Sequence, residues 1–186
     1  ALDYAQRNKG RRNEARASLS LGSLKMTQGD STEAVTYLEK ALRFYQDGGY
    51  RQETAQALLL FGRANRQKGD YDAALRAFEQ QLATAEQEQN IPRQALAQEG
   101  LGTVLFRRER YVEALTHFEN SYSLFSKSDN QLAKANSMIN RAGMLLALGR
   151  YQEAQGILAE ASEKAAKVGN KQLQVSIGLQ QAKAAL

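Results

Sequence analysis

The sequence GDYDAALRAF at residues 69–78 decides the fold of this chain. It starts with turn residues and continues with apolar side chains at helical spacing, which predicts a tight turn followed by an amphipathic helix. Related stretches begin at residues 29, 109 and 149, and all four place alanine at the same point, at Ala34, Ala74, Ala114 and Ala154. The alanines are 40 residues apart without an insertion. The chain therefore contains an internal repeat, and a period of this size indicates a stacked array.

The composition predicts an all-α fold. The chain has 186 residues, of which 42% are hydrophobic and 24% are charged, so it can bury a sizeable core and is not expected to be disordered. It contains one proline, while Ala, Gln, Leu and Glu are abundant. These residues lose little side-chain freedom in a helix, and β-branched residues are scarce. Helices are therefore expected throughout.

Several classes of protein are excluded or disfavoured. The chain has no cysteine, which excludes disulfides, thiolate metal sites and cysteine nucleophiles, and fits a reducing compartment such as the cytoplasm. No apolar run approaches the ~18–20 residues needed to cross a bilayer. The net charge of +5 could favour an acidic partner, but a mixed-charge solvated surface is the simpler explanation. Residues 1–4 align with residues 41–44 inside a repeat, so we expect a fragment of a longer protein that begins within a helix.

The repeat divides the chain into one array of helix pairs. Half a repeat at 1–10 is followed by whole repeats at 11–50, 51–90, 91–130 and 131–170, and by half a repeat at 171–186. The first helix is expected to end near Gly10, and the next to cover 11–28, where Ala17, Leu21 and Leu24 follow one another at helical spacing. Stacking makes the core of such arrays continuous. Both ends are thus expected to be apolar, which would allow end-to-end self-association.

Short helix–helix turns are predicted from the residues that close each repeat. Asn90, Asn130 and Asn170 hold the same place, and asparagine both tolerates left-handed backbone and caps helix starts. Pro92, the only proline, falls in the first turn of the following helix, where its missing N–H costs nothing.

The pattern resembles the tetratricopeptide repeat over essentially the whole chain. The first helix of each pair carries Leu-Gly or a variant of it, at Leu21-Gly22, Phe61-Gly62 and Leu101-Gly102, whereas Arg141-Ala142 departs from the pattern. Gly69-Asp70-Tyr71 matches the family's turn fully. The 40-residue period resembles that of the Pins and LGN polarity adaptors, kinesin-light-chain-like proteins and arrays in bacterial regulators. The resemblance implies an α-α superhelix, a solenoid of antiparallel helix pairs.

Small residues fall where the two helices of a pair must approach closely. Glycine inside a helix costs about 1 kcal/mol relative to alanine, so Gly22, Gly62 and Gly102 indicate a steric need. The alanines of the second helices are expected to be small for the same reason. Phe78 and Phe118 are expected to fill the gap towards the next repeat.

The resemblance implies that a peptide ligand lies along the inner wall, which the first helices of the pairs form. Carried over position by position, this groove comprises Leu19, Ser23, Met26, Leu59, Arg63, Arg66, Glu99, Thr103, Phe106, Arg107, Ile139, Asn140, Gly143 and Leu146. The apolar members would be anchors, and the arginines would pair with carboxylates. The alternative is that Arg63 and Arg66 are only solvated, and that Met26 and Leu146 pack against neighbouring helices. Asn140 matches an asparagine that often holds ligand backbone.

Groups that perform chemistry are nearly absent. His117 is the only histidine and has no partner cluster, so a packing or surface role is expected, with no metal, no cofactor and no enzymatic activity. Glu113 and Glu153 recur with the repeat as first-turn residues that favour the helix dipole. Nucleic-acid binding is disfavoured because a basic stripe with stacking aromatics is missing.

Two functions remain open from sequence. The first is a scaffold that binds a protein or peptide partner in the concave groove. The second is a sensor or regulatory segment of a larger signalling ATPase or enzyme, acting by intramolecular docking.

Overall fold

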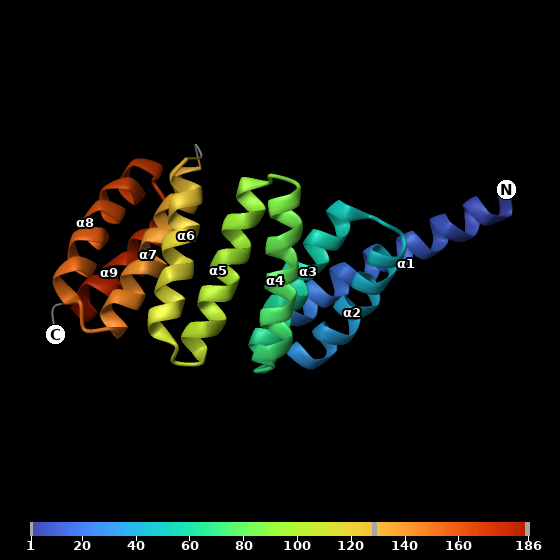
Figure 1. Cartoon of the computed structure of the whole chain (residues 1–186), viewed down its shortest axis with the longest axis horizontal. Helices are drawn as coiled ribbons and strands as arrows, with labels where there is room; N and C mark the ends of the chain where they lie inside the picture. Colours follow the sequence, from blue (N-terminus) through green and yellow to red (C-terminus); the bar gives the residue numbers. More distant parts are fainter. Residues whose placement is uncertain (1, 128–129, 185–186) are drawn as a thin grey trace. The chain divides into compact units, whose positions relative to one another are not determined.

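The chain is all-α over residues 2–127 and 130–184, the ranges that this computed structural model describes (Figure 1). Its helices are α1 (Leu2–Thr27), α2 (Ser31–Asp47), α3 (Arg51–Lys68), α4 (Tyr71–Gln87), α5 (Ile91–Arg107), α6 (Tyr111–Ser126), α7 (Gln131–Ala147), α8 (Tyr151–Val168) and α9 (Lys171–Ala184). They form two compact units, residues 1–84 and 85–186, which are described separately below.

In the first unit, α1 and α2 form an antiparallel hairpin, and α3 packs against both of them. The core of this unit is a cluster of buried side chains that includes Leu38, Tyr45 and Leu58, with small residues such as Ala34 and Ala41 between them. Burying each of the larger side chains stabilises the unit by roughly 1.5–3 kcal/mol.

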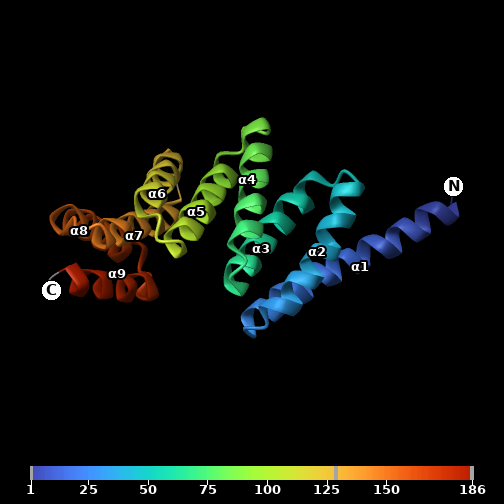
Figure 2. The same cartoon turned by 60° about the horizontal axis from the view of Figure 1, so that its bottom comes forward.

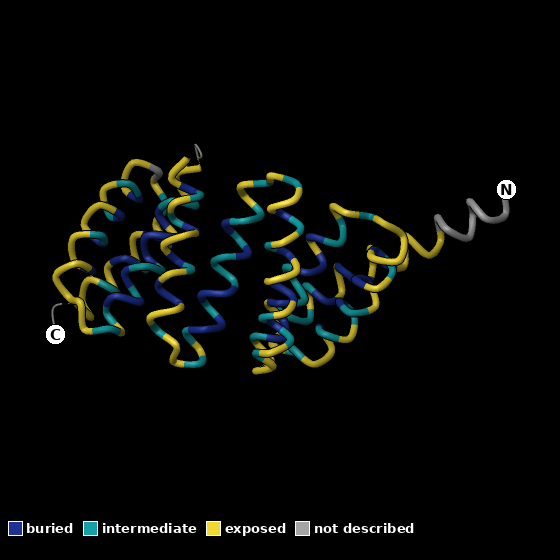
Figure 3. The backbone as a smooth tube through the Cα atoms, viewed as in Figure 1, coloured by how far each residue is buried: buried dark blue, intermediate teal, exposed yellow. Residues whose placement is uncertain are grey.

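In the second unit, α5 pairs with α6 and α7 pairs with α8, and α9 packs against α7 and α8 (Figure 2). The buried side chains include Leu105, Phe118, Met138, Leu145 and Ile177. Figure 3 shows buried positions recurring along these helices between exposed ones, as expected for amphipathic helices packed on one face.

Side-chain caps start several helices, as the sequence predicts. Asn90 accepts a hydrogen bond from the backbone N–H of Arg93 at 3.1 Å. Asn130 and Asn170 accept equivalent bonds from Ala133 and Leu173, both at 3.0 Å. Each cap satisfies one of the N–H groups that a helix start leaves without a partner. Pro92 lies in the first turn of α5, which confirms its predicted place.

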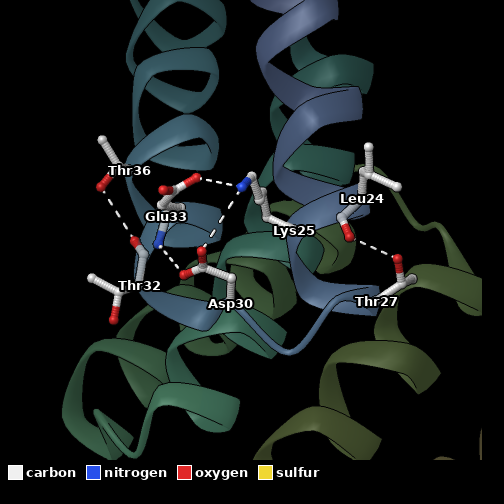
Figure 4. Close-up of polar contacts among 7 residues, drawn as sticks. All are labelled: Leu24, Lys25, Thr27, Asp30, Thr32, Glu33 and Thr36. Atoms are coloured by element: carbon white, nitrogen blue, oxygen red, sulfur yellow. Dashed lines mark hydrogen bonds and ion pairs between the residues drawn. The ribbon is translucent and has the colours of Figure 1, made fainter.

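The turn between α1 and α2 joins a side-chain cap to an ion pair (Figure 4). Asp30 accepts a hydrogen bond from the backbone N–H of Glu33 at 3.2 Å. Lys25 of α1 donates to the Glu33 carboxylate at 2.6 Å, and this bond raises the pKa of Lys25. Thr27 donates to the carbonyl oxygen of Leu24 at 2.7 Å, closing the last turn of α1. Residues of both α1 and α2 therefore stabilise this turn.

The predicted close approach is present in the helix pairs that carry Gly22, Gly62 and Gly102. A β-carbon added at Gly62 would lie 2.8 Å from two ring carbons of Phe78, and one added at Gly102 would lie 3.1 Å from the ring of Phe118. The Phe78 and Phe118 rings, which were expected to fill the gap towards the next repeat, also lie against the glycine of their own helix pair. Phe118 in addition faces a cavity that residues of α7 line.

One expectation about α1 is wrong. The helix does not end near Gly10 but continues to Thr27. The stripe of Ala17, Leu21 and Leu24 is exposed, with Leu21 39% and Leu24 50% accessible, while Ala15 and Leu19 are buried instead. At the other end, Val175 and Leu179 of α9 are 64% and 63% exposed. Apolar side chains are thus exposed at both ends, and end-to-end self-association stays a prediction.

A candidate peptide-binding groove on α5, α7 and α9

A cavity of about 540 Å³ opens in the second unit, lined mainly by α5, α7 and α9. This volume lies within the range of roughly 300–1,000 Å³ that is typical of ligand sites. Half of the residues predicted to form the groove meet here. They are Thr103, Phe106, Arg107, Ile139, Asn140, Gly143 and Leu146.

A second cavity, of about 380 Å³, shares Ile139 and Asn140 with the first. It also contains Glu99, another predicted groove residue, and its remaining lining is mostly polar. The lining consists of Glu99, Leu132, Asn136, Ile139, Asn140, Asn170, Gln172, Leu173 and Ser176. The two cavities together form what we call the α5–α7–α9 groove, defined by their lining residues.

The helix spacing explains why α5 presents its residues together. Glu99, Thr103, Phe106 and Arg107 follow one another at steps of four, three and one, so they lie on one side of the helix. Thr103 donates a hydrogen bond to the carbonyl oxygen of Glu99 at 2.7 Å, which holds its side chain along the helix. The ring of Phe106 lies 5.7 Å from that of Tyr111, the first residue of α6.

A hydrogen bond joins the predicted groove residues of α5 and α7. The side-chain Nδ2 of Asn140 donates to Oε1 of Glu99 at 3.1 Å. Asn140 has a second N–H and an amide oxygen that this bond does not use. It can therefore orient Glu99 and still hydrogen-bond the backbone of a bound segment.

The larger cavity combines apolar walls with positive charge. Phe106, Ile139 and Leu146 supply apolar surface, and Arg107 and Lys183 supply two cations. The described lining residues of this cavity include no Asp or Glu. Such an arrangement can bind an apolar side chain next to a carboxylate, which arginine binds with two parallel hydrogen bonds.

The predicted groove residues of the first unit are arranged differently. Leu19, 9% exposed, belongs to the core, and Met26 packs against that core, as the alternative interpretation had it. Ser23, Leu59 and Arg66 are half-buried, and Arg63 is exposed. The two cavities described in this unit are lined by other residues, one between α1 and α2 and one beside Phe61 and Arg76.

Sequence reasoning missed some lining residues of the larger cavity, namely Met144, Ala147, Tyr151, Gln180 and Lys183. A signal for two of them was present. Gln180 and Lys183 stand 40 residues after Asn140 and Gly143, so extending the repeat register into the last half repeat would have placed them in the groove.

Other candidate chemistry does not gather into a site. His117 is half-buried, with Nδ1 2.6 Å from Oε1 of Gln98. Across residues 2–127 and 130–184, His, Asp and Glu do not form a group of three able to hold a metal ion. Within the same ranges, every helix is too short or too polar to span a lipid bilayer.

Comparison with known proteins settles the family. The sequence profile described as "Tetratricopeptide repeat" matches residues 1–87 and 93–167. The chain belongs to the tetratricopeptide repeat family. A curated relative of this tetratricopeptide repeat chain is the 43 kDa receptor-associated protein of the synapse from Tetronarce californica, 27% identical over 174 residues. The match covers 92% of this chain and 42% of that protein, so the chain spans less than half of its relative.

Solved structures share the tetratricopeptide repeat fold at low identity. Aspartyl phosphate phosphatase F from Bacillus subtilis superposes with a TM-score of 0.85 at 15% identity, covering 92% of this chain and 45% of that one. The Rap conjugation gene regulator of the plasmid pLS20, solved in complex with the Phr* peptide, gives a TM-score of 0.77 at 19% identity, covering 90% and 46%. At these identities the likeness shows the fold alone.

Proposed function

We propose that this chain is a protein-interaction module without catalytic activity, which binds a peptide segment of a partner protein in the α5–α7–α9 groove. The observation that carries the proposal is the cavity of about 540 Å³ whose apolar walls adjoin Arg107 and Lys183. An acidic peptide with a large apolar side chain fits this lining. The Rap regulator of the same fold was solved with a peptide, which supports a peptide as the ligand class.

The arrangement of the repeats supports a module of the 40-residue subtype. Asn90, Asn130 and Asn170 start the first helices of successive pairs with the same cap. Because the repeat keeps one 40-residue register, residues at equivalent positions of successive pairs are expected to gather on one wall. Solenoids use such walls as extended binding surfaces.

The experiment that tests this function is a peptide selection followed by binding measurements. A library of displayed peptides is selected on the chain, and the affinity of the enriched peptides is measured by fluorescence anisotropy. Leu146→Asp, which places a charge on the apolar wall, and Arg107→Glu should each weaken binding at least tenfold. Val112→Asp on α6 is the matched control, since Val112 is exposed and outside the groove lining. Circular dichroism shows whether each variant is folded.

Equal affinity of the folded Leu146→Asp, Arg107→Glu and Val112→Asp variants would place the binding surface elsewhere.

A regulatory segment of a larger signalling protein is the second candidate from sequence. The sequence of the parent protein on either side of this chain decides between a free-standing adaptor and such a segment.

A further inference from the structure

The two cavities of the α5–α7–α9 groove carry opposite charge. In the larger cavity, Arg107 and Lys183 are the charged residues among the described lining. In the smaller cavity, Glu99 is the charged residue, and amide and hydroxyl side chains make up most of the rest. Over the described ranges, neither Arg107 nor Lys183 forms an ion pair, so both cations are available to a ligand.

The distance between the opposite charges follows from the helix that bears them. Glu99 and Arg107 are both on α5, eight residues apart. At a rise of 1.5 Å per residue, their positions are separated by about 12 Å along the helix axis. Ile139 of the neighbouring α7 lines both cavities and so lies between the two ends.

The hydrogen bond from Asn140 fixes the position of the Glu99 carboxylate, which is the negatively charged end of the groove. Asn140 and Glu99 are on different helices, and the bond of 3.1 Å ties the carboxylate to α7 at the junction of the cavities. A second carboxylate oxygen of Glu99 stays able to accept a bond from a ligand cation. The negative charge is thus part of the groove wall rather than a mobile surface charge.

We propose that the groove recognises an extended segment that carries a basic and an acidic side chain four residues apart, with an apolar side chain midway between them. In an extended chain, a rise of about 3.3 Å per residue makes four residues span about 13 Å, close to the separation of the groove charges. Side chains at positions one, three and five of such a segment point to the same side. The basic residue then meets Glu99, the apolar residue meets Ile139, and the acidic residue meets Arg107 and Lys183.

This inference rests on the proposed function, and it adds the charge pattern and spacing of the ligand. It differs from binding of any acidic peptide, because an all-acidic segment would place a carboxylate against Glu99. Like charges brought together in this way weaken binding, and the loss grows as the salt concentration is lowered.

The test uses four synthetic peptides with acetylated and amidated ends, so that only side chains carry charge. They contain Lys-Ala-Leu-Ala-Asp, Asp-Ala-Leu-Ala-Asp, Lys-Ala-Leu-Ala-Lys, or the shortened Lys-Leu-Asp, each flanked by glycine. Fluorescence anisotropy at low salt should show the first peptide binding about tenfold more tightly than each of the others.

Charge reversals of the groove residues then test which of them contacts the basic end of the peptide and which contacts the acidic end. Glu99→Lys should transfer the preference to the peptide with two aspartates. The double substitution Arg107→Glu and Lys183→Glu should transfer it to the peptide with two lysines. Glu79→Lys on α4 is the control for a change of net charge, since Glu79 is exposed and outside the groove lining, and it should leave the order of the peptides unchanged.

Equal affinity for the four peptides, failure of all of them to bind, or a preference that the reversals do not move would each overturn the charge pattern. These outcomes are separable from failure of the proposed function. If a peptide selected on the chain binds and Leu146→Asp weakens its binding, the groove binds peptides, and any of these outcomes then shows that only the charge pattern is wrong.

Discussion

Asn140 on α7 donates its side-chain N–H to the Glu99 carboxylate on α5, at 3.1 Å, where the two cavities of the groove meet. Both residues face ligand space, since both line the smaller cavity. The bond therefore does two things at once. It orients a charged group that a ligand can use, and it leaves Asn140 with a donor and an acceptor for the ligand's backbone.

Removal of the Asn140 amide should weaken ligand binding more than it weakens the fold. We expect Asn140→Ala to reduce the affinity for a selected peptide by about threefold to tenfold, because a net hydrogen bond is worth roughly 0.5–1.5 kcal/mol. Asn120→Ala on the exposed side of α6 is the matched control. Isothermal titration of both variants measures the difference. Identical affinities of the two variants would show that Asn140 does not contribute to ligand binding.

Gly62 should not tolerate a methyl group. Its added β-carbon would lie 2.8 Å from the Phe78 ring, so Gly62→Ala should destabilise the chain by about 1–2 kcal/mol, despite the better helix propensity of alanine. Gly156 on α8 has no neighbouring atom within 4 Å of such a carbon, so Gly156→Ala should stabilise by up to about 1 kcal/mol. Urea unfolding measures both. Stabilisation by both substitutions would contradict the close packing of α3 and Phe78.

A substitution in the turn between α5 and α6 should increase the stability of the chain. Glu109 has a φ of +60°, whereas glycine occupies the corresponding position at Gly69, with a φ of +90°. A residue with a β-carbon pays roughly 1–2 kcal/mol in this conformation, so Glu109→Gly should stabilise the chain by about 1 kcal/mol. Glu109→Ala keeps the β-carbon and should give no comparable gain. Thermal unfolding distinguishes the two, and a loss of stability in the glycine variant would contradict the turn geometry.

The ion pair between Arg12 and Glu53 should make stability depend on pH. Arg12 of α1 donates to the Glu53 carboxylate of α3 at 2.5 Å, and this hydrogen bond lowers the pKa of Glu53 below its ordinary value of 4.5. Since the folded pKa is the lower one, the contribution is complete above the ordinary pKa and is lost as the pH falls through the lowered value.

We therefore expect Glu53→Gln to lower the melting temperature at pH 7 and to have a smaller effect at pH 3. Glu79→Gln on α4 is the control, because Glu79 is exposed and forms no ion pair over the described residues. Melting curves of the three proteins at both pH values give the comparison. A deficit of Glu53→Gln that is as large at pH 3 as at pH 7 would show that the carboxylate charge is not the cause.

Local signals were enough to predict where several of the helices start. The turn and helix predicted for the stretch that begins at residue 29 correspond to α2, Ser31–Asp47, because turn residues act on the chain within a few positions. The asparagine caps and Pro92 are equally local. Gly10 was misjudged because one glycine costs only about 1 kcal/mol inside a helix, which its neighbours can offset.

The packing of individual faces could not be predicted in the same way. Two stripes of α1 fit helical periodicity, one through Ala17 and Leu21 and one through Ala15 and Leu19, and the structure buries the second. Periodicity states which residues share a face, whereas burial depends on which helix stands beside that face. For the same reason, Leu19 is in the core while its equivalent Glu99 lines a cavity.

The most direct test of the proposed groove is methyl NMR of the isoleucine side chains during titration with a selected peptide. Ile139 lies where the two cavities meet, whereas Ile91 lies at the start of α5, outside the lining of both. The proposal predicts a saturable shift of the Ile139 δ1-methyl signal and an unchanged Ile91 signal. A peptide that binds with the same affinity while the Ile139 signal stays in place would contradict the proposal.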